Sequence, residues 1–341
     1  MFDPSELAKK KNALSKTEPL PDRSINLGAP EIDVVAYQKK MVAVNIEHWI
    51  NELKGLTFET EFYPLSEENA RVLMKAYDLK QEKKPFTQDV QTAFNEIETG
   101  LQKVIDSVRG ADTKVFVKTS SRSAKDTVIY AAQFESVYKE CLKKLKEQDM
   151  NAKVVALMQA GTLLLATKNA KELLENFVLS ERVYIDMRVA LNLPEQFSEN
   201  FAVRKWIDID VDMEFRGFVY DNKLTQLSQY NHLPYFERLI ERKDELLAKI
   251  VKFYEEKVMP RLKDKFTAYV VDFAITGENY DQLWVIELNP FEDTTDGAMF
   301  SWQKERDLLL GKKPFEFRLK EKKDAGIKAA IMSSWRKFIE E

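Results

Sequence analysis

The chain has 341 residues, of which 44% are apolar and 11% aromatic, so it can bury a substantial core, and its length indicates roughly two domains or one large one. Its 52 basic and 56 acidic residues nearly cancel to a net charge of −4, which argues against non-specific binding of nucleic acid. One cysteine and two histidines exclude an internal disulfide, a cysteine-rich zinc site and a histidine-based metal site. Any chemistry is therefore left to carboxylates, lysines and arginines.

Membrane and secretion signals are absent from the sequence pattern. No apolar run approaches the roughly 20 residues of a membrane span, and the first residues lack the apolar core of a signal peptide. We therefore expect a cytoplasmic protein without a membrane partner, in the reducing compartment that a single cysteine suits.

The first half of the chain alternates helical and strand patterns after a polar arm that contains several prolines, residues 1–30. Hydrophobic periodicity predicts, in order, a helix over 31–53, a strand over 56–65, a helix over 66–77, an amphipathic helix ending near 108 and a strand over 114–119. Ser123 and Asp126 match an S-x-x-D capping box, which predicts a helix from there to about 146.

The second half continues the same alternation. Residues 151–192 are predicted to be mainly helical with one strand, and they are followed by a strand over 200–206, a hairpin over 214–230 that turns at Asp221–Asn222, a helix over 234–258, strands over 266–274 and 283–289, and a charged helical segment at the end. We expect an α+β protein with antiparallel sheets. Its predicted parts are the arm 1–30, a lobe over 31–200, a lobe over 201–305 and the segment 306–341.

The last strand pattern, WVIELN, contains two polar residues. Alternation predicts that Val285, Glu287 and Asn289 share one face, and a hairpin centred near 279–280 sets Asp272 opposite Glu287. Facing carboxylates repel unless a cation lies between them, and two carboxylates with an amide oxygen are ligands that Mg²⁺ or Mn²⁺ prefers. Because Mg²⁺ usually completes its shell with nucleotide phosphates, a triphosphate is implied. The alternative is a solvated face on which the acids pair with lysines.

Lys118 ends the strand KVFVKT and precedes a turn rich in serine and threonine that contains Arg122. Hydroxyls, exposed backbone donors and a cation could together cradle a phosphate, although the turn has no glycine and is not a Walker loop. The alternative is an ordinary strand followed by a capped helix.

Arg216 lies between two phenylalanines in the strand EFRGFV. An unpaired guanidinium there would be costly, so we expect it to meet a phosphate or one of the carboxylates. The preceding run Arg204, Lys205 and Trp206 could contact a purine through its backbone and indole. An ordinary salt bridge for Arg216 and a core position for Trp206 are the alternatives.

The order of these pieces resembles the cell division cycle protein 123 family. The likeness extends from about His48 to Trp302, and its most specific parts are EFRGFV with LSQY, and ELNPF followed by TD and FSW. The resemblance implies an ATP-grasp-like fold of two α+β lobes with antiparallel sheets and the nucleotide between them. It also implies ATP and Mg²⁺ as cofactors.

The resemblance carries roles onto individual residues. Lys118 and Arg216 would contact the phosphates, while Arg204, Lys205, Trp206 and Ile207 would form the linker on the adenine side. Asp272, Glu287 and Asn289 would be the magnesium ligands. Two departures indicate a divergent branch: KTSSRSAKD stands where the family usually reads K-L-N-W-S-x-P-K-D, and Glu287 stands where the family usually has aspartate.

Two functions follow from the resemblance. Eukaryotic members of the family assemble translation initiation factor 2 by binding its gamma subunit, which implies an ATP-binding chaperone linked to translation initiation and the cell cycle. The rival is an ATP-grasp ligase or phosphotransferase, in which Mg²⁺ and Arg216 would stabilise charge on the transferred phosphate. No residue in the sequence identifies an acceptor substrate.

Overall fold

The structure is a computed structural model that describes residues 24–25, 32–110 and 114–340. Most of the predicted N-terminal arm lies outside the described residues. The chain forms two compact units, each built from separate stretches of sequence. Unit 1 comprises 1–48, 59–127 and 166–206, and unit 2 comprises 49–58, 128–165 and 207–341.

Unit 1 contains a four-stranded antiparallel sheet in the order β3-β6-β4-β5. The strands are β3 (Thr60–Leu65), β4 (Val115–Thr119), β5 (Ala166–Thr167) and β6 (Glu199–Lys205). The larger helices are α3 (Glu67–Gln81), α4 (Gln88–Arg109), α7 (Ala170–Phe177) and α8 (Glu181–Leu191). Smaller elements are β1 (Ser24–Ile25), β2 (Ile32–Asp33), α2 (Val34–Val42), η1 (Ile46–His48) and η3 (Pro194–Gln196).

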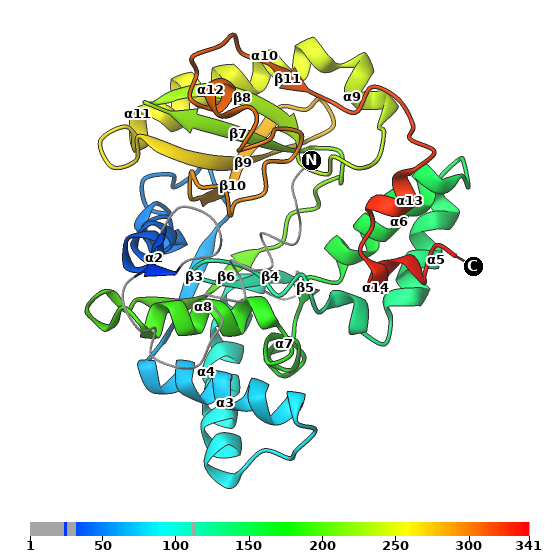
Figure 1. Cartoon of the computed structure of the whole chain (residues 1–341). Helices are drawn as coiled ribbons and strands as arrows, with labels where there is room; N and C mark the ends of the chain where they lie inside the picture. The colour runs from blue at the N-terminus through cyan, green and yellow to red at the C-terminus, as the bar shows by residue number, and fades with distance from the viewer. Residues whose placement is uncertain (1–23, 26–31, 111–113, 341) are drawn as a thin grey trace. The chain divides into compact units, whose positions relative to one another are not determined.

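Helix α4 covers one face of this sheet because its apolar residues recur at helical spacing. Phe94, Ile97 and Leu101 share one core with Val117 and Val203 of the strands. Figure 1 shows α4 running below β3, β6 and β4. The residues that alternate with Val117 and Val203 along these strands point to the other face of the sheet.

Two predictions about the start of unit 1 have different outcomes. The capping box at Ser66 is confirmed, because its side chain accepts from the Asn69 N–H and Asn69 Oδ1 accepts from the Ser66 N–H. The helix predicted over 31–53 is wrong in extent: α2 ends at Val42, and only the single turn η1 follows within that range.

Unit 2 contains a five-stranded sheet in the order β10-β9-β7-β8-β11. The strands are β7 (Glu214–Tyr220), β8 (Lys223–Gln229), β9 (Ala268–Thr276), β10 (Gln282–Asn289) and β11 (Phe317–Arg318), and all pairs are antiparallel except β8 with β11. The predicted turn between β7 and β8 is confirmed, since Asp221 and Asn222 have φ of 50° and 59°.

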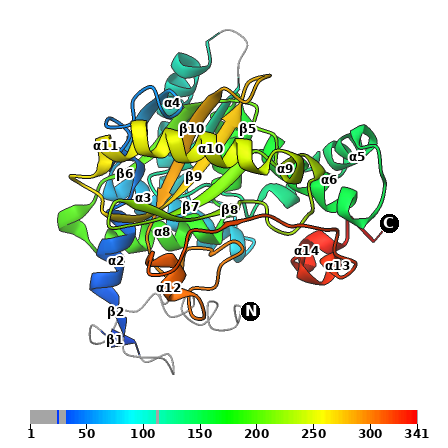
Figure 2. The same ribbon diagram turned by 90° about the horizontal axis from the view of Figure 1, so that it is seen from above.

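One face of this sheet is covered by the predicted long helix, which is divided into shorter elements. These are α9 (Glu237–Glu241), α10 (Lys243–Phe253), the π-helix η4 (Tyr254–Val258) and α11 (Met259–Leu262). Figure 2 shows α10 crossing β9 and β10. Phe253 packs against Phe273 with ring centroids 6.2 Å apart, so Phe273 faces the helix and its neighbour Asp272 faces away.

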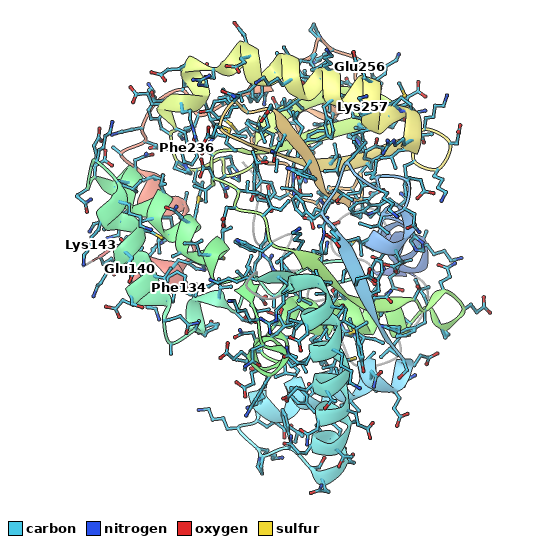
Figure 3. All side chains as sticks on the ribbon, turned by 180° about the vertical axis from the view of Figure 1, so that it is seen from behind. Phe134, Glu140, Lys143, Phe236, Glu256 and Lys257 are labelled. Carbon is cyan, nitrogen blue, oxygen red and sulfur yellow. The ribbon has the colours of Figure 1, made fainter. Side chains whose placement is uncertain are left out.

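A helical part of unit 2 combines α5 (Phe134–Lys144) and α6 (Met150–Leu163) with the end of the chain. Phe134 is buried against Trp335 and Phe338, while Glu140 and Lys143 lie on the exposed side of α5 (Figure 3). The smaller helices of unit 2 are η2 (Val128–Tyr130), α12 (Arg306–Leu309), α13 (Ile327–Ala330) and α14 (Ser333–Arg336).

The predicted charged helical segment at 306–341 is mostly irregular over its described residues. Its helices are four residues long, and Gly311 and Pro314 lie between α12 and β11, while Gly326 lies between β11 and α13. Among all described residues, no helix combines the length and apolar character that crossing a membrane requires.

Candidate functional site

A buried ion pair lies at the centre of the sheet of unit 2. Arg216 of β7 is directly opposite Asp272 of β9. Its Nε donates to Asp272 Oδ1 at 2.8 Å and its Nη2 donates to Oδ2 at 2.7 Å. Arg216 is 5% exposed and Asp272 is 1% exposed. This bidentate pair is one of the two outcomes that the sequence predicted for Arg216.

The surroundings of Arg216 hold the guanidinium in place. Its Nη1 donates to the Asp296 carbonyl oxygen at 2.7 Å, and its guanidinium carbon lies 4.8 Å from the centre of the Tyr230 ring. Burial by itself would lower the pKa of Arg216, but the Asp272 carboxylate outweighs burial and raises it above the ordinary value. The guanidinium therefore remains charged.

Glu287 and Asn289 join Asp272 from the neighbouring strand. Glu287 pairs with Asp272 in the β9–β10 register, as predicted, and Asn289 pairs with Val270 two residues along. Asn289 Nδ2 donates to Asp272 Oδ2 at 3.2 Å. The two carboxylates and the amide therefore lie on one sheet face, opposite the face that α10 covers.

The predicted position of Val285 is wrong, because β10 contains a β-bulge. The register shifts between Val285 and Glu287, so Val285 pairs with Phe273 and belongs to the buried face. The same shift places Trp284 opposite Ala274, on the face of Asp272, where its Nε1 donates to Thr276 Oγ1 at 2.9 Å. Strict alternation was wrong here because the bulge adds one residue to β10.

In unit 1, Lys118 and Arg204 lie on one face of the four-stranded sheet. Lys118 pairs with Ala202, and Arg204 pairs with Phe116 two residues before Lys118. The two cations therefore project from neighbouring strands on the face opposite the α4 core. Lys118 is 2% exposed and Arg204 is fully buried, with its Nε 3.4 Å from Thr60 Oγ1.

The rest of the predicted linker follows Arg204 directly. Lys205 is exposed, and its Nζ lies 3.9 Å from Glu59 Oε2. Trp206 is half-buried, and its backbone N–H donates to the Lys114 carbonyl oxygen at 3.2 Å. Ile207 is half-buried and is the first residue of the next stretch of unit 2. The role of these residues as a linker that contacts a purine stays a prediction.

The turn after Lys118 is closed by its own hydrogen bonds. Thr119 N–H and Oγ1 both donate to the Arg122 carbonyl oxygen, each at 2.9 Å. Arg122 Nε donates to Asp186 Oδ2 of α8 at 2.7 Å, and the Ser121 hydroxyl donates to the same carboxylate. Arg122 and the Thr119 and Ser121 hydroxyls thus have partners within unit 1, and the phosphate cradle stays a prediction.

The predicted capping box at Ser123 is wrong. Asp126 accepts a hydrogen bond from Ser180 Oγ at 2.7 Å, and Ser180 is the N-cap residue of α8. The first α-helix after Ser123 begins only at Phe134. A contact between residues 54 positions apart thus replaces the local cap that the motif predicted.

The donors of unit 2 fit a hard divalent cation. Within the described ranges, no three histidine, cysteine, aspartate or glutamate side chains are grouped as metal ligands, so a metal would need the Asn289 amide oxygen together with Asp272 and Glu287. Asp272 Oδ2 accepts from both Arg216 Nη2 and Asn289 Nδ2, whereas Oδ1 accepts from Arg216 Nε. Because a carboxylate oxygen has two lone pairs, these three bonds leave one lone pair on Oδ1.

A cluster of buried acids in unit 1 was missed in the sequence because its members come from three separate segments. Glu199 begins β6, is 3% exposed, and its Oε2 has no hydrogen-bond partner among the described residues. Burial, and then the carboxylates of Asp186 and Glu47, raise the pKa of Glu199 well above its ordinary value. Burial also raises the pKa of Glu47.

Tyr230 and Asp296 were also missed as neighbours of Arg216. Both lie in motifs that the sequence singled out, LSQY and TD. A second bulge, between Phe218 and Val219, sets Arg216 opposite Ser228, two residues before Tyr230. The LSQY motif identifies Tyr230, but the contact of its ring with Arg216 depends on the β7–β8 register, which cannot be read from alternation alone.

Comparison with protein families and relatives gives a consistent match. The D123 family model matches residues 59–336. A Xenopus laevis protein named translation initiation factor eIF2 assembly protein is 32% identical over 105 residues, which are 31% of this chain and 30% of that protein. Cell division cycle protein 123 of Yarrowia lipolytica is 36% identical over 110 residues, 32% of this chain and 28% of its own. The chain thus spans less than a third of the length of these curated relatives in the alignments.

Solved structures extend the match to most of the chain. Cdc123 from Schizosaccharomyces pombe covers 83% of this chain and 98% of its own, with a TM-score of 0.58 at 20% identity. Its C-terminally truncated form gives 0.60 over 84% of this chain. The predicted α+β fold with antiparallel sheets is confirmed, and it is the ATP-grasp-like fold of Cdc123.

Proposed function

The chain belongs to the D123 family, and from that premise we propose that it binds ATP together with Mg²⁺. The observation that carries this proposal is the face of unit 2 on which Asp272, Glu287 and Asn289 meet beside Arg216. Magnesium supplies charge neutralisation for the nucleotide phosphates when it is bound. The donor set matches its preference for carboxylate and amide oxygens.

The residues of this chain have separate roles in the proposal. Arg216 orients the Asp272 carboxylate through two hydrogen bonds, and Oδ1, which accepts only one of the three bonds from Arg216 and Asn289, is the oxygen that would bind the metal. Asn289 donates through Nδ2 to Asp272, which leaves its amide oxygen as a ligand. In unit 1, Lys118 and Arg204 provide buried positive charge on one sheet face, which suits an anionic group such as a phosphate.

We further propose that the nucleotide-bound protein is an assembly chaperone for translation initiation factor 2 in the cytoplasm, acting through the gamma subunit. Support comes from the names of the relatives in Xenopus laevis and Dictyostelium discoideum, both called translation initiation factor eIF2 assembly protein. In this role ATP orders the protein for partner capture and need not be turned over.

Isothermal titration calorimetry tests the metal assignment. Glu287→Gln removes one ligand charge without touching the Arg216–Asp272 pair, so we expect ATP affinity in Mg²⁺ to fall at least about tenfold. Glu278→Gln, in the exposed turn of the same hairpin, is the matched control and should bind as the parent does. Equal ATP affinity for the two variants would refute Glu287 as a metal ligand.

A binding assay with purified gamma subunit tests the chaperone role. We expect capture of the gamma subunit that depends on Mg²⁺ and ATP, with negligible release of ADP. ATP turnover that requires an added acceptor would instead identify an ATP-grasp enzyme, and failure to capture the gamma subunit would remove the chaperone assignment.

A further inference from the structure

The sheet of unit 2 ends at β11, and among the described residues no further strand pairs with its outer side. β11 pairs with β8 through Phe317 opposite Leu227 and Arg318 opposite Ser228 (Figure 1). Leu227 N–H donates to the Glu316 carbonyl oxygen, and Gln226 and Gln229 accept from the N–H groups of Glu316 and Lys320. Backbone groups alternate along a strand, so those of Phe317 and Leu319 point away from β8.

A cavity of about 940 Å³ lies against this edge. It is lined by the continuous segment 316–325 together with Lys243 of α10 and Met299. A space of this size lies within the range of ligand pockets, roughly 300–1,000 Å³. Because ten consecutive residues of an edge segment line it, its shape suits a ligand that extends along the chain rather than a compact one.

The charge of the lining is predominantly positive, with five cationic and three acidic side chains. Three of the cations are paired: Arg318 with Glu305, Lys320 with Asp324, and Lys323 with Asp149. Of the remaining two, Lys243 lies on α10, and Lys322 lies near the Asp324 carboxylate, whose pKa its charge helps to lower. With the exposed Glu321 also in the lining, the cavity keeps an excess of positive charge, to which Lys243 and Lys322 contribute.

The two faces of the edge differ in character. Phe317 and Leu319 are buried at 7% and 4% exposure, while Arg318 and Lys320 alternate with them on the other face. If a strand were added beside β11, its side chains would alternate between two faces of the sheet. One set would lie on the face of Phe317 and Leu319, and the other on the face of Arg318 and Lys320.

We propose that this edge binds an extended segment of a partner protein in which acidic and apolar residues alternate, by adding it as a strand beside β11. Backbone hydrogen bonds to Phe317 and Leu319 would give affinity, and Lys243 and Lys322 would select acidic side chains. This binding surface goes beyond the proposed function and does not depend on nucleotide.

Fluorescence anisotropy with labelled peptides tests the proposal on the full chain. The probe is a peptide of alternating glutamate and valine, and the reference is its lysine–valine counterpart. We expect the acidic peptide to bind at least about tenfold tighter at low salt, with an affinity that falls as salt screens the lysines. Methylating alternate backbone nitrogens along the edge-facing side of the acidic peptide should abolish binding, because the strand could no longer donate to β11.

Charge reversal on the protein provides the matched comparison. Lys243→Glu with Lys322→Glu should weaken binding of the acidic peptide at least about tenfold. Lys252→Glu with Lys257→Glu changes net charge equally at exposed lysines further along the same helical layer (Figure 3), and should leave binding unchanged. Equal loss in both pairs, or equal binding of the two peptides, would overturn the proposal and leave the lysines with the role of keeping other strands from the edge.

Discussion

Asp272 and Glu199 are both acids on central strands with almost no exposure to water, but their surroundings differ. Asp272 in unit 2 receives two hydrogen bonds from Arg216 and one from Asn289. Glu199 in unit 1 is near the carboxylates of Asp186 and Glu47 and has an oxygen without a partner among the described residues. A buried acid can therefore be held charged by a guanidinium or made neutral by a proton, and its neighbours decide which occurs.

The largest effect is expected when Arg216 is removed. Arg216→Met leaves Asp272 buried without its counter-charge, and we expect the free energy of unfolding to fall by about 3–5 kcal/mol in urea denaturation near neutral pH. The double variant Arg216→Met with Asp272→Leu removes both charges and should recover most of that loss. A single variant as stable as the parent would show that Asp272 does not need the guanidinium.

Removing the charge of Glu199 should stabilise the protein, whereas removing the charge of Arg216 destabilises it. Its pKa is higher in the folded protein than in the unfolded chain, so the stability that protonation contributes is full at low pH and is lost as pH rises through the folded pKa. Glu199→Gln should therefore raise the free energy of unfolding by about 1–3 kcal/mol at alkaline pH and make it less dependent on pH.

The control for this variant is Glu195→Gln, an exposed glutamate four residues earlier in unit 1. It should leave both the stability and its pH dependence unchanged. If Glu199→Gln instead destabilises the protein at alkaline pH, the carboxylate is charged there and is stabilised by its neighbours Asn45 and the Ser120 backbone.

Arg122 brings a positive charge to the acidic cluster through its ion pair with Asp186. Its side chain is 30% exposed, so water shares in stabilising both charges, and the Ser121 hydroxyl still donates to Asp186 without it. We expect Arg122→Gln to cost about 1–2 kcal/mol of unfolding free energy, less than Arg216→Met. A cost equal to that of Arg216→Met would remove the distinction between the two sites.

Tyr230 should have the smallest effect. Tyr230→Leu keeps an apolar side chain near Arg216 and removes the aromatic face, and we expect a loss of about 0.5–1 kcal/mol in the same denaturation experiment. If Arg216→Met is made first, the Tyr230 change should cost less, because the cation it contacts is already gone.

Local patterns correctly predicted which residues of the β9–β10 hairpin in unit 2 lie opposite each other at Asp272 and Glu287. A hairpin centre near 279–280 is enough to place Asp272 opposite Glu287, since register follows from where the chain turns. The bulge at Val285–Glu287 could not be predicted from alternation, and Val285 beside it is bridged by Thr57, which lies far away in the sequence. Alternation likewise places Lys118 on one face of its strand, but Arg204 joins it there only through the β4–β6 pairing.

Local sequence patterns did not predict contacts between residues that lie far apart in the sequence. Asp126 had the spacing of a local cap, but Ser180 binds it instead. Glu47, Asp186 and Glu199 carry no shared motif, because they belong to η1, α8 and β6 and come together only when the sheet and its helices pack.

The segment at residues 56–58, which forms an isolated bridge to β10, also has a consequence for folding. Val285 N–H donates to the Leu56 carbonyl oxygen, and Thr57 Oγ1 donates to the Val285 carbonyl oxygen, across a separation of 228 residues from Thr57 to Val285. Contacts of such long range form slowly because a large loop must close first. During synthesis on the ribosome, the early segment would wait through most of translation before its partner strand emerged. From the emergence of β10 until the early segment joins it, the outer edge of β10 would be open to pairing with other chains, which exposes this step to aggregation.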